Sequence, residues 1–161
     1  MDKVYIICID DQQEVLNALE QDLAFFDEKL NVEVCDTAQE ALDLMEEIDG
    51  NGDFVALVIT DQVMPEMSGV ELLKEIENDE RYALTRRMLL TGQATHHDTI
   101  EAINLGGVDQ YLAKPWTRDQ LHSSVRKLLT HYFFKKGIDY QAYQDNLDQD
   151  LVYKYLRNET I

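Results

Sequence analysis

Five polar side chains, each placed just after a short apolar run, could together bind a divalent cation and a phosphoryl group. They are Asp10, Asp11, Asp61, Thr91 and Lys114. Because open α/β sheets bind ligands at the carboxyl ends of their strands, we expect these side chains to meet at one edge of a sheet. Three carboxylates suit a hard cation such as Mg²⁺. A lysine and a threonine can neutralise and hydrogen-bond the oxygens of a transferred phosphoryl group.

Strand-like and helix-like segments alternate along the chain, and they must position these side chains. The expected strands are Val4–Ile9, Val32–Cys35, Phe54–Thr60, Arg87–Thr91 and Val108–Leu112. The expected helices are Gln13–Phe26, Thr37–Ile48 with a capping box of Thr37 and Glu40, Val70–Ile76, Thr99–Leu105 and Thr117–His131. The alternation predicts an α/β fold with a doubly wound, five-stranded parallel sheet flanked by five helices.

Charge is the unusual feature of the composition. The 161 residues include 32 acidic and 14 basic ones, which gives a net charge of −18. Such a surface repels nucleic acid and anionic lipid, so neither is an expected partner of this chain. The sequence begins without a signal-peptide pattern, and no apolar run approaches the roughly 20 residues of a membrane helix. We therefore expect a cytoplasmic protein in which Cys8 and Cys35 are buried free thiols.

From about Lys3 to Thr130, the chain resembles the receiver domain of two-component response regulators. The resemblance rests on Asp10-Asp11, on Asp61 followed by Met64-Pro65 and Ser68-Gly69, on Thr91, and on Lys114-Pro115. It implies a flavodoxin-like sheet with strand order 2-1-3-4-5. It also implies that the Lys114-Pro115 bond is cis.

The same resemblance implies the roles of the site residues. Asp61 would be the phosphoacceptor. Mg²⁺ would be bound by Asp10, Asp11, Asp61 and the backbone carbonyl of Val63. Lys114 and Thr91 would contact the phosphoryl oxygens, and Thr91 with Tyr111 would form the conformational switch.

The function implied is that of a phosphorylation-switched signalling module, not an enzyme with its own turnover. The phosphoryl group would come from a histidine kinase or a phosphotransfer protein, and the face of the fourth helix, fifth strand and fifth helix would bind a downstream protein or a missing output domain. A homodimer through that face or through the chain's tail is also compatible with the sequence. The resemblance also implies that the positions two after Asp61 and two after Thr91, here Val63 and Gln93, tune how fast the phosphoryl group is lost to water. Apolar Val63 cannot orient an attacking water by hydrogen bonding, which predicts a long-lived phosphorylated form.

Two other functions are open on the sequence. One is a receiver-like interaction scaffold that works without phosphorylation, although the complete set of acids argues against it. The other is an Mg²⁺-dependent phosphatase of the haloacid-dehalogenase type, which uses an aspartate nucleophile. That class needs a second acid two residues after the nucleophile on the first strand, where this chain has Gln12 and Gln13.

The end of the chain exceeds what a receiver domain needs. We expect a receiver domain over residues 1–131 and a helical extension, or the start of a linker to a missing output domain, over 138–161. Apolar residues from Tyr140 to Leu156 recur at helical spacing after Gly137, which predicts one amphipathic helix that either folds back or binds another chain. We expect His96-His97 to be solvated, His122 and His131 to lie on helix surfaces, and Asp79–Arg87 to be an exposed loop.

Overall fold

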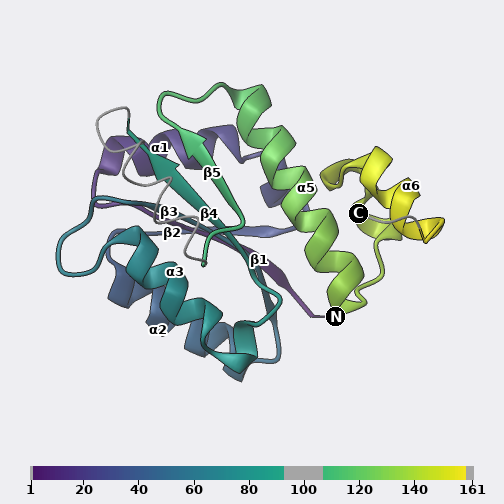
Figure 1. Ribbon diagram of the computed structural model, residues 1–161, viewed down its shortest axis with the longest axis horizontal. Coiled ribbons are helices and arrows are strands. Elements are labelled where there is room, and N and C mark those ends of the chain that lie inside the picture. The colour runs from purple at the N-terminus through teal and green to yellow at the C-terminus, as the bar shows by residue number, and fades with distance from the viewer. Residues whose placement is uncertain (1, 93–106, 159–161) are drawn as a thin grey trace.

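The computed structural model describes residues 2–92 and 107–158, and its centre is a parallel sheet of five strands (Figure 1). The strand order is β2-β1-β3-β4-β5. The strands are β1 (Val4–Ile9), β2 (Asn31–Cys35), β3 (Phe54–Asp61), β4 (Arg86–Thr91) and β5 (Gln110–Ala113). Every neighbouring pair is parallel, so the predicted α/β fold and strand order are confirmed.

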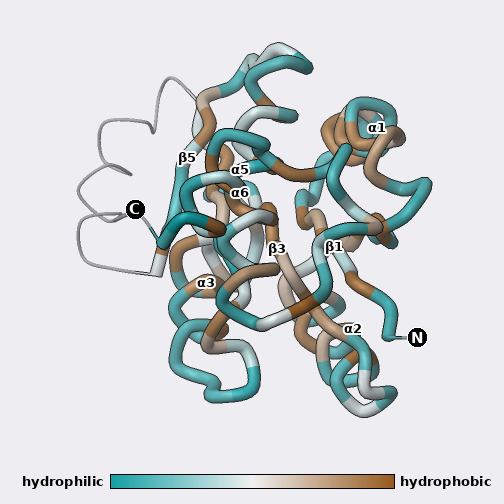
Figure 2. The backbone as a smooth tube through the Cα atoms, turned by 90° about the vertical axis from the view of Figure 1, so that its right-hand side faces the viewer, coloured by the Kyte–Doolittle hydropathy of each residue, from teal (hydrophilic) through white to brown (hydrophobic). Residues whose placement is uncertain are grey.

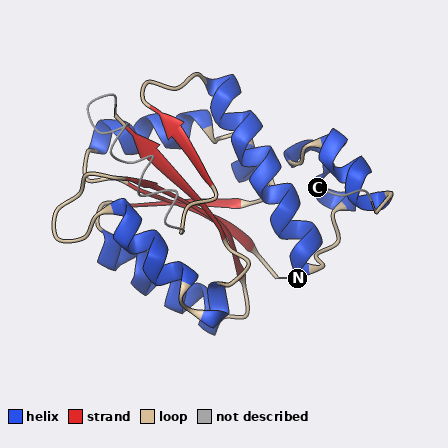
Figure 3. Ribbon diagram, viewed as in Figure 1, coloured by secondary structure: helices blue, strands red, loops and turns tan. Residues whose placement is uncertain are grey.

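Helices cover both faces of the sheet (Figures 1 and 3). One face carries α1 (Gln13–Asp22) and α5 (Arg118–Lys136), and the other carries α2 (Ala38–Gly50) and α3 (Gly69–Glu77). Alternate residues of β1 therefore enter two separate cores. Ile6 and Cys8 pack in the core under α1 and α5, while Ile7 and Ile9 pack in the core under α2 and α3. The predicted fourth helix, Thr99–Leu105, and His96-His97 lie outside the described residues.

Burial explains the apolar character of the central strands. Figure 2 shows hydrophobic residues along β3, and each residue from Val55 to Asp61 is buried. Cys8 and Cys35 are buried free thiols, as predicted, and burial raises the pKa of Cys35 to about 12. Among the described residues, no helix is both long enough and apolar enough to cross a membrane.

Helix ends differ from the predicted ones where local hydrogen bonds decide them. The chain leaves α1 after Asp22 and forms a short 3-10 helix, Phe26–Glu28, that buries Phe26. Helix α5 continues to Lys136 because Gly137 provides the left-handed cap at φ 82°.

The predicted capping box of α2 is only half present. Thr37 accepts a hydrogen bond from the Glu40 N–H at 3.0 Å, as expected. The Glu40 carboxylate instead accepts from the N–H of Asp36, at 3.4 Å. A complete capping box is found at the start of α5, between Thr117 and Gln120. The Glu40 side chain therefore binds the backbone one residue before the N-cap of α2, whereas Gln120 binds the N-cap residue of α5 itself.

The segment after Gly137 is not one continuous helix. It forms a 3-10 helix, Gln141–Asn146, and then α6 (Gln149–Leu156). Leu147 between them is extended, and the Asp148 side chain caps α6 by accepting from the Leu151 N–H at 3.1 Å. The single predicted helix is therefore wrong, although the predicted break at Gly137 is confirmed.

This segment folds back onto α5 (Figure 1). The Tyr155 ring stacks on Phe134 with centroids 4.6 Å apart. The hydroxyl of Thr130, buried within α5, accepts a hydrogen bond from the Asp148 N–H at 2.9 Å. Leu147 is buried in the same core as α1 and α5. The division into a receiver domain over residues 1–131 and an extension over 138–161 stays a prediction. So does the continuation of this extension into a linker to an output domain.

The expected exposed loop at Asp79–Arg87 is instead structured and partly buried. It contains a 3-10 helix, Glu80–Tyr82, and the start of β4. Tyr82 and Arg87 are buried. The Arg87 guanidinium can be buried because it donates to the backbone carbonyls of Gly107 and Thr85. The sequence pattern did not show that Tyr82 and Arg87 are buried, because the partners of Arg87 are backbone carbonyls that the fold brings to it.

Candidate functional site at the carboxyl edge of the sheet

The predicted acidic residues meet at the carboxyl edge of the sheet. Asp10 follows β1, and Asp61 is the last residue of β3, the neighbouring strand. Asp10 is fully buried, Asp61 is 8% exposed, and Asp11 is exposed. One carboxylate oxygen from each of the three lies within 4.8 Å of the others. Parallel strands end on the same edge, and this brings together residues about 50 positions apart in the sequence.

Lys114 enters this acidic cluster from the end of β5. Its Nζ lies 2.6 Å from Asp61 Oδ1 and 3.3 Å from Asp10 Oδ2. Its backbone N–H donates to the Thr91 carbonyl at 2.7 Å, which ties the loop after β5 to the end of β4. The Lys114-Pro115 peptide bond is cis, as predicted. The lysine therefore pairs with both buried carboxylates.

Burial and charge shift the pKa values of this cluster. Burial raises the pKa of Asp10, and the Asp61 charge raises it further, although the Gln12 N–H and Lys114 oppose the shift. Burial alone would lower the pKa of Lys114, but hydrogen bonds and charge from Asp61 and Asp10 outweigh it, and the pKa is raised. Lys114 is therefore a cation at neutral pH, next to two carboxylates.

The donor set fits a hard divalent cation. Mg²⁺ takes oxygen ligands, with one or two carboxylates and several waters. Asp11 is exposed, so it could bind a cation that keeps waters. Asp10 Oδ1 accepts from the Gln12 N–H at 2.8 Å and Asp61 Oδ2 accepts from the Val63 N–H at 3.2 Å, which orients both carboxylates. The role of the Val63 backbone carbonyl as a cation ligand stays a prediction.

The two predicted switch residues lie on neighbouring strands. Thr91 is the last residue of β4 and is fully buried. Tyr111 on β5 pairs in register with Leu89 of β4, and it is 42% exposed. Their positions are compatible with a coupled rearrangement, which itself stays a prediction. Gln93 lies outside the described residues.

The sequence did not indicate a second group of contacts, next to Lys114. The Trp116 indole N–H donates to Asp22 Oδ2 at 2.9 Å, and Arg118 Nε donates to Asp22 Oδ1 at 3.3 Å. A ring nitrogen of His122 pairs with the Asp22 carbonyl. His122 is therefore partly buried, contrary to the prediction. No local pattern marks Asp22, because its partners lie more than 90 residues away.

His131 is also not a solvated surface residue. Its Nδ1 lies 2.6 Å from the Tyr155 hydroxyl, and the two rings meet edge to face. Burial is the main cause that lowers the pKa of His131. The contact exists only because α6 folds back, which explains why the helical pattern of α5 alone placed His131 in solvent.

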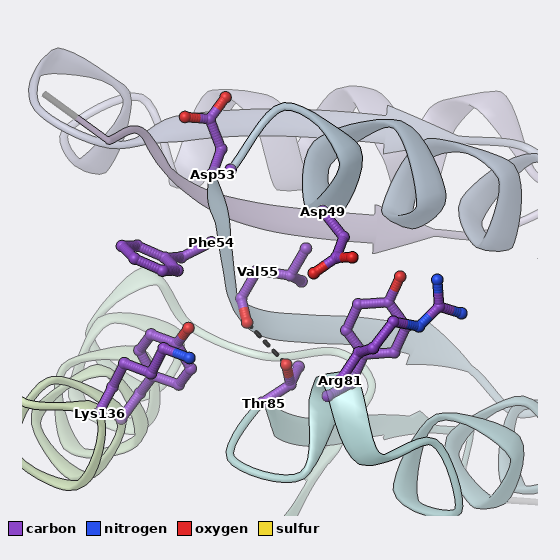
Figure 4. Close-up of a pocket in the computed structure, with 10 residues that line it drawn as sticks. Asp49, Asp53, Phe54, Val55, Arg81, Thr85 and Lys136 are labelled. Carbon is purple, nitrogen blue, oxygen red and sulfur yellow. Dashed lines mark hydrogen bonds between the residues drawn. The ribbon is translucent and has the colours of Figure 1, made fainter.

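A hollow of about 110 Å³ lies at the opposite edge of the sheet, where β3 begins (Figure 4). It is lined by Arg81, Tyr82, Thr85 and Lys136, among others. The Thr85 hydroxyl donates to the Val55 carbonyl at 2.7 Å beside it. Within the described part of the chain, the group of three metal-ligating side chains lies at the carboxyl edge and not here. The carboxyl edge is therefore the candidate site.

Comparisons with known proteins identify the family of the chain. A family model described as the response regulator receiver domain matches residues 6–126. The hydrogenase transcriptional regulatory protein HoxA of Cupriavidus necator is 33% identical over 122 residues, which are 76% of this chain and 23% of HoxA. Chemotaxis protein CheY1 of Helicobacter pylori is 27% identical over 77% of this chain and 95% of CheY1. The chain thus spans about a quarter of HoxA but nearly all of CheY1.

A solved structure shares the architecture. The signal receiver domain of an HD domain-containing protein from Pseudomonas fluorescens Pf-5 superposes with a TM-score of 0.72 at 29% identity. The superposition covers 86% of this chain and 96% of that one. The region that the family model matches contains the three acids, the threonine and the lysine at the carboxyl edge.

Proposed function

Because the chain belongs to the response regulator receiver family, we propose that Asp61 accepts a phosphoryl group in an Mg²⁺-dependent reaction that switches a protein-interaction face. The observation that supports this most is the pairing of Lys114 Nζ with Asp61 Oδ1 at 2.6 Å, beside two further carboxylates. A cation placed against a nucleophilic carboxylate is positioned to neutralise the charge that arrives with a phosphoryl group.

The proposed reaction transfers the phosphoryl group of a phosphohistidine to Asp61. A carboxylate oxygen of Asp61 attacks phosphorus, a P–O bond forms, and the P–N bond to the donor imidazole breaks. The imidazole leaves with the electron pair and takes up a proton from solvent. Bound Mg²⁺ would neutralise the phosphoryl oxygens during this transfer.

The residues around Asp61 orient the nucleophile and its product. The Val63 N–H holds Oδ2 at 3.2 Å, so the carboxylate has a defined orientation. The Lys114 ammonium would leave Asp61 Oδ1 and bind a phosphoryl oxygen instead. This is possible because both are anionic oxygens and the phosphoryl group would be attached to the same carboxylate. The hydroxyl of buried Thr91 would donate to another phosphoryl oxygen. This contact would couple the product to Tyr111 on β5.

The proposed partners are proteins. A histidine kinase or phosphotransfer protein would supply the phosphoryl group, and a downstream protein or an output domain would bind the switched face of β5 and α5. A net charge of −18 disfavours nucleic acid as a direct partner of this chain. Val63 is apolar and 63% exposed, so it cannot hold an attacking water by a side-chain hydrogen bond. We therefore expect slow loss of the phosphoryl group.

Intact mass spectrometry tests the proposal. The protein is incubated with acetyl phosphate and Mg²⁺, beside Asp61→Asn and the matched control Asp53→Asn. Asp53 is a carboxylate at the opposite edge of the sheet, where it accepts from the Lys3 N–H at 2.9 Å. An added mass of about 80 Da is expected on the wild type and on Asp53→Asn but not on Asp61→Asn, and only with Mg²⁺.

Two outcomes would contradict the proposal. Uptake by Asp61→Asn would mean that another residue is the acceptor. No uptake by the wild type, with Mg²⁺ binding intact, would favour a scaffold that works without phosphorylation. A phosphatase would release phosphate continuously from the donor, but the residues two after Asp10 and Asp11 are Gln12 and Gln13, and neither is the acid that such an enzyme needs.

A further inference from the structure

One residue at the end of α1 contacts three residues of the segment that follows Lys114. Asp22 accepts hydrogen bonds from Trp116 Nε1 at 2.9 Å and from Arg118 Nε at 3.3 Å, and its backbone carbonyl pairs with His122. The Asp22 side chain is 21% exposed and that of Arg118 is 61% exposed. The Trp116 contact is thus the better shielded of the two side-chain contacts.

The other end of this segment is held at the site. Lys114 lies two residues before Trp116, and its backbone N–H donates to the Thr91 carbonyl at 2.7 Å. Its Nζ pairs with Asp61 at 2.6 Å. Trp116 itself is partly buried and packs against the core under α1 and α5. The loop from β5 to α5 is therefore attached at two points, Thr91 before Pro115 and Asp22 after it.

We propose that Asp22 is a positioning residue that holds the loop through Trp116 and so places the Lys114 ammonium against Asp61. This inference rests on the function proposed above. Asp22 does not contact the reacting atoms, and its effect would pass through the indole and the backbone of residues 114–116.

Elementary chemistry supports this role for a carboxylate. The indole N–H can only donate, and a charged acceptor makes a stronger hydrogen bond than a neutral one. The lysine stem is flexible, so its ammonium has a defined place at the site only if the backbone that carries it is fixed as well as the carboxylates that it contacts. Small displacements of a positioned group are costly, since a shift of about 1 Å can reduce a rate by about a hundredfold.

The test measures the initial rate of phosphoryl uptake from acetyl phosphate at saturating Mg²⁺. Trp116→Phe keeps an aromatic ring against the core but removes the N–H together with part of the indole, so it is read beside Asp22→Ala, which leaves the indole whole. Asp22→Ala removes both acceptor oxygens, whereas Asp22→Asn keeps one for the indole. We expect uptake to slow by about tenfold in Trp116→Phe and Asp22→Ala, and Asp22→Asn to recover most of the rate.

Two controls separate positioning from a general loss of structure. Asp27→Asn alters a carboxylate that accepts from the Val32 N–H at 2.9 Å, near α1 but outside the contacts with residues 114–122, and it should react at the wild-type rate. Trp116→Phe should also have little effect, less than about twofold, in a Lys114→Met background, because residues that act through one group are not additive.

The outcomes divide clearly. Trp116→Phe and Asp22→Ala at the wild-type rate, or Asp22→Asn as slow as Asp22→Ala, would overturn the positioning role while leaving the proposed function intact. An equal effect of Trp116→Phe with and without Lys114 would also overturn it. If the wild type takes up no phosphoryl group, the proposed function fails and this inference fails with it.

Discussion

Gly69 sits where any side chain would collide with the proposed phosphoacceptor. It begins α3, after Ser68, and its N–H donates to the Gln62 carbonyl at 3.0 Å. A Cβ atom at this position would lie 2.2 Å from the Asp61 carbonyl oxygen and 2.7 Å from Leu89 Cδ1. Leu89 can change its rotamer, but the Asp61 carbonyl belongs to the backbone of β3. Gly69→Ala must therefore separate α3 from the end of β3.

The cost follows from the size of the overlap. The oxygen contact is more than about 1 Å shorter than an ordinary van der Waals contact. Overpacking of this kind costs about 1–3 kcal/mol, and a backbone collision belongs at the upper end. For a chain of this size, about 3 kcal/mol corresponds to a fall in Tm of about 6–12 °C. Because Asp61 moves with its carbonyl, phosphoryl uptake should also slow.

The assay is thermal unfolding followed by circular dichroism, together with the acetyl phosphate reaction. Gly50→Ala is the matched control. Gly50 ends α2, and a Cβ there meets nothing within 4 Å. Alanine is favoured over glycine within a helix by about 1 kcal/mol, so this variant should be unchanged or slightly more stable. A Gly69→Ala protein with the Tm and uptake rate of Gly50→Ala would refute the reasoning.

Three further predictions concern the tail, pH and metal. Leu147→Ala should lower the free energy of unfolding by about 2–4 kcal/mol, because Leu147 is buried. Leu156 is 53% exposed, so Leu156→Ala should lower it by less than about 1 kcal/mol. Equal values for the two variants would mean that the tail is undocked in solution. Burial and nearby cations lower the pKa of His131 below 6.5 in the folded protein. As the pH falls, His131 is therefore protonated in the unfolded chain before it is protonated in the folded one. Stability should therefore decline as the pH falls through about 6.5, and His131→Gln should lose less Tm between about pH 7.5 and about pH 5.5 than the wild type; an equal loss would exclude this role. Mg²⁺ should raise the Tm of the wild type, as a ligand that binds only the folded state does, and chelation should reverse the gain. Asp11→Asn should reduce the gain, and a full gain in that variant would remove Asp11 from the ligands.

Local patterns in the sequence determined most of the sheet and the location of the site. Apolar runs that are buried on both faces predicted the strands, and the polar residue after each run predicted the edge at which ligands bind. The prediction that four residues meet at one edge needed only the rule that parallel strands end on the same side. These residues are Asp10, Asp61, Thr91 and Lys114. The ends of α1 and α5 were predicted less well, because hydrogen bonds near Phe26 and Gly137 decide them.

Only the tertiary structure decided which distant groups meet. The amphipathic spacing of the tail is the same whether it packs on α5 or on another chain, so the sequence left its partner open. Asp22 has no local feature that points to Trp116, 94 residues later. In the sequence, Gly69 looks like any residue at the start of a helix. Only the packing of the Asp61 carbonyl against it shows why a side chain would not fit there. The spacing of apolar residues indicates which face of a helix or strand is buried. It does not indicate which residues that face contacts, because this depends on how the elements pack.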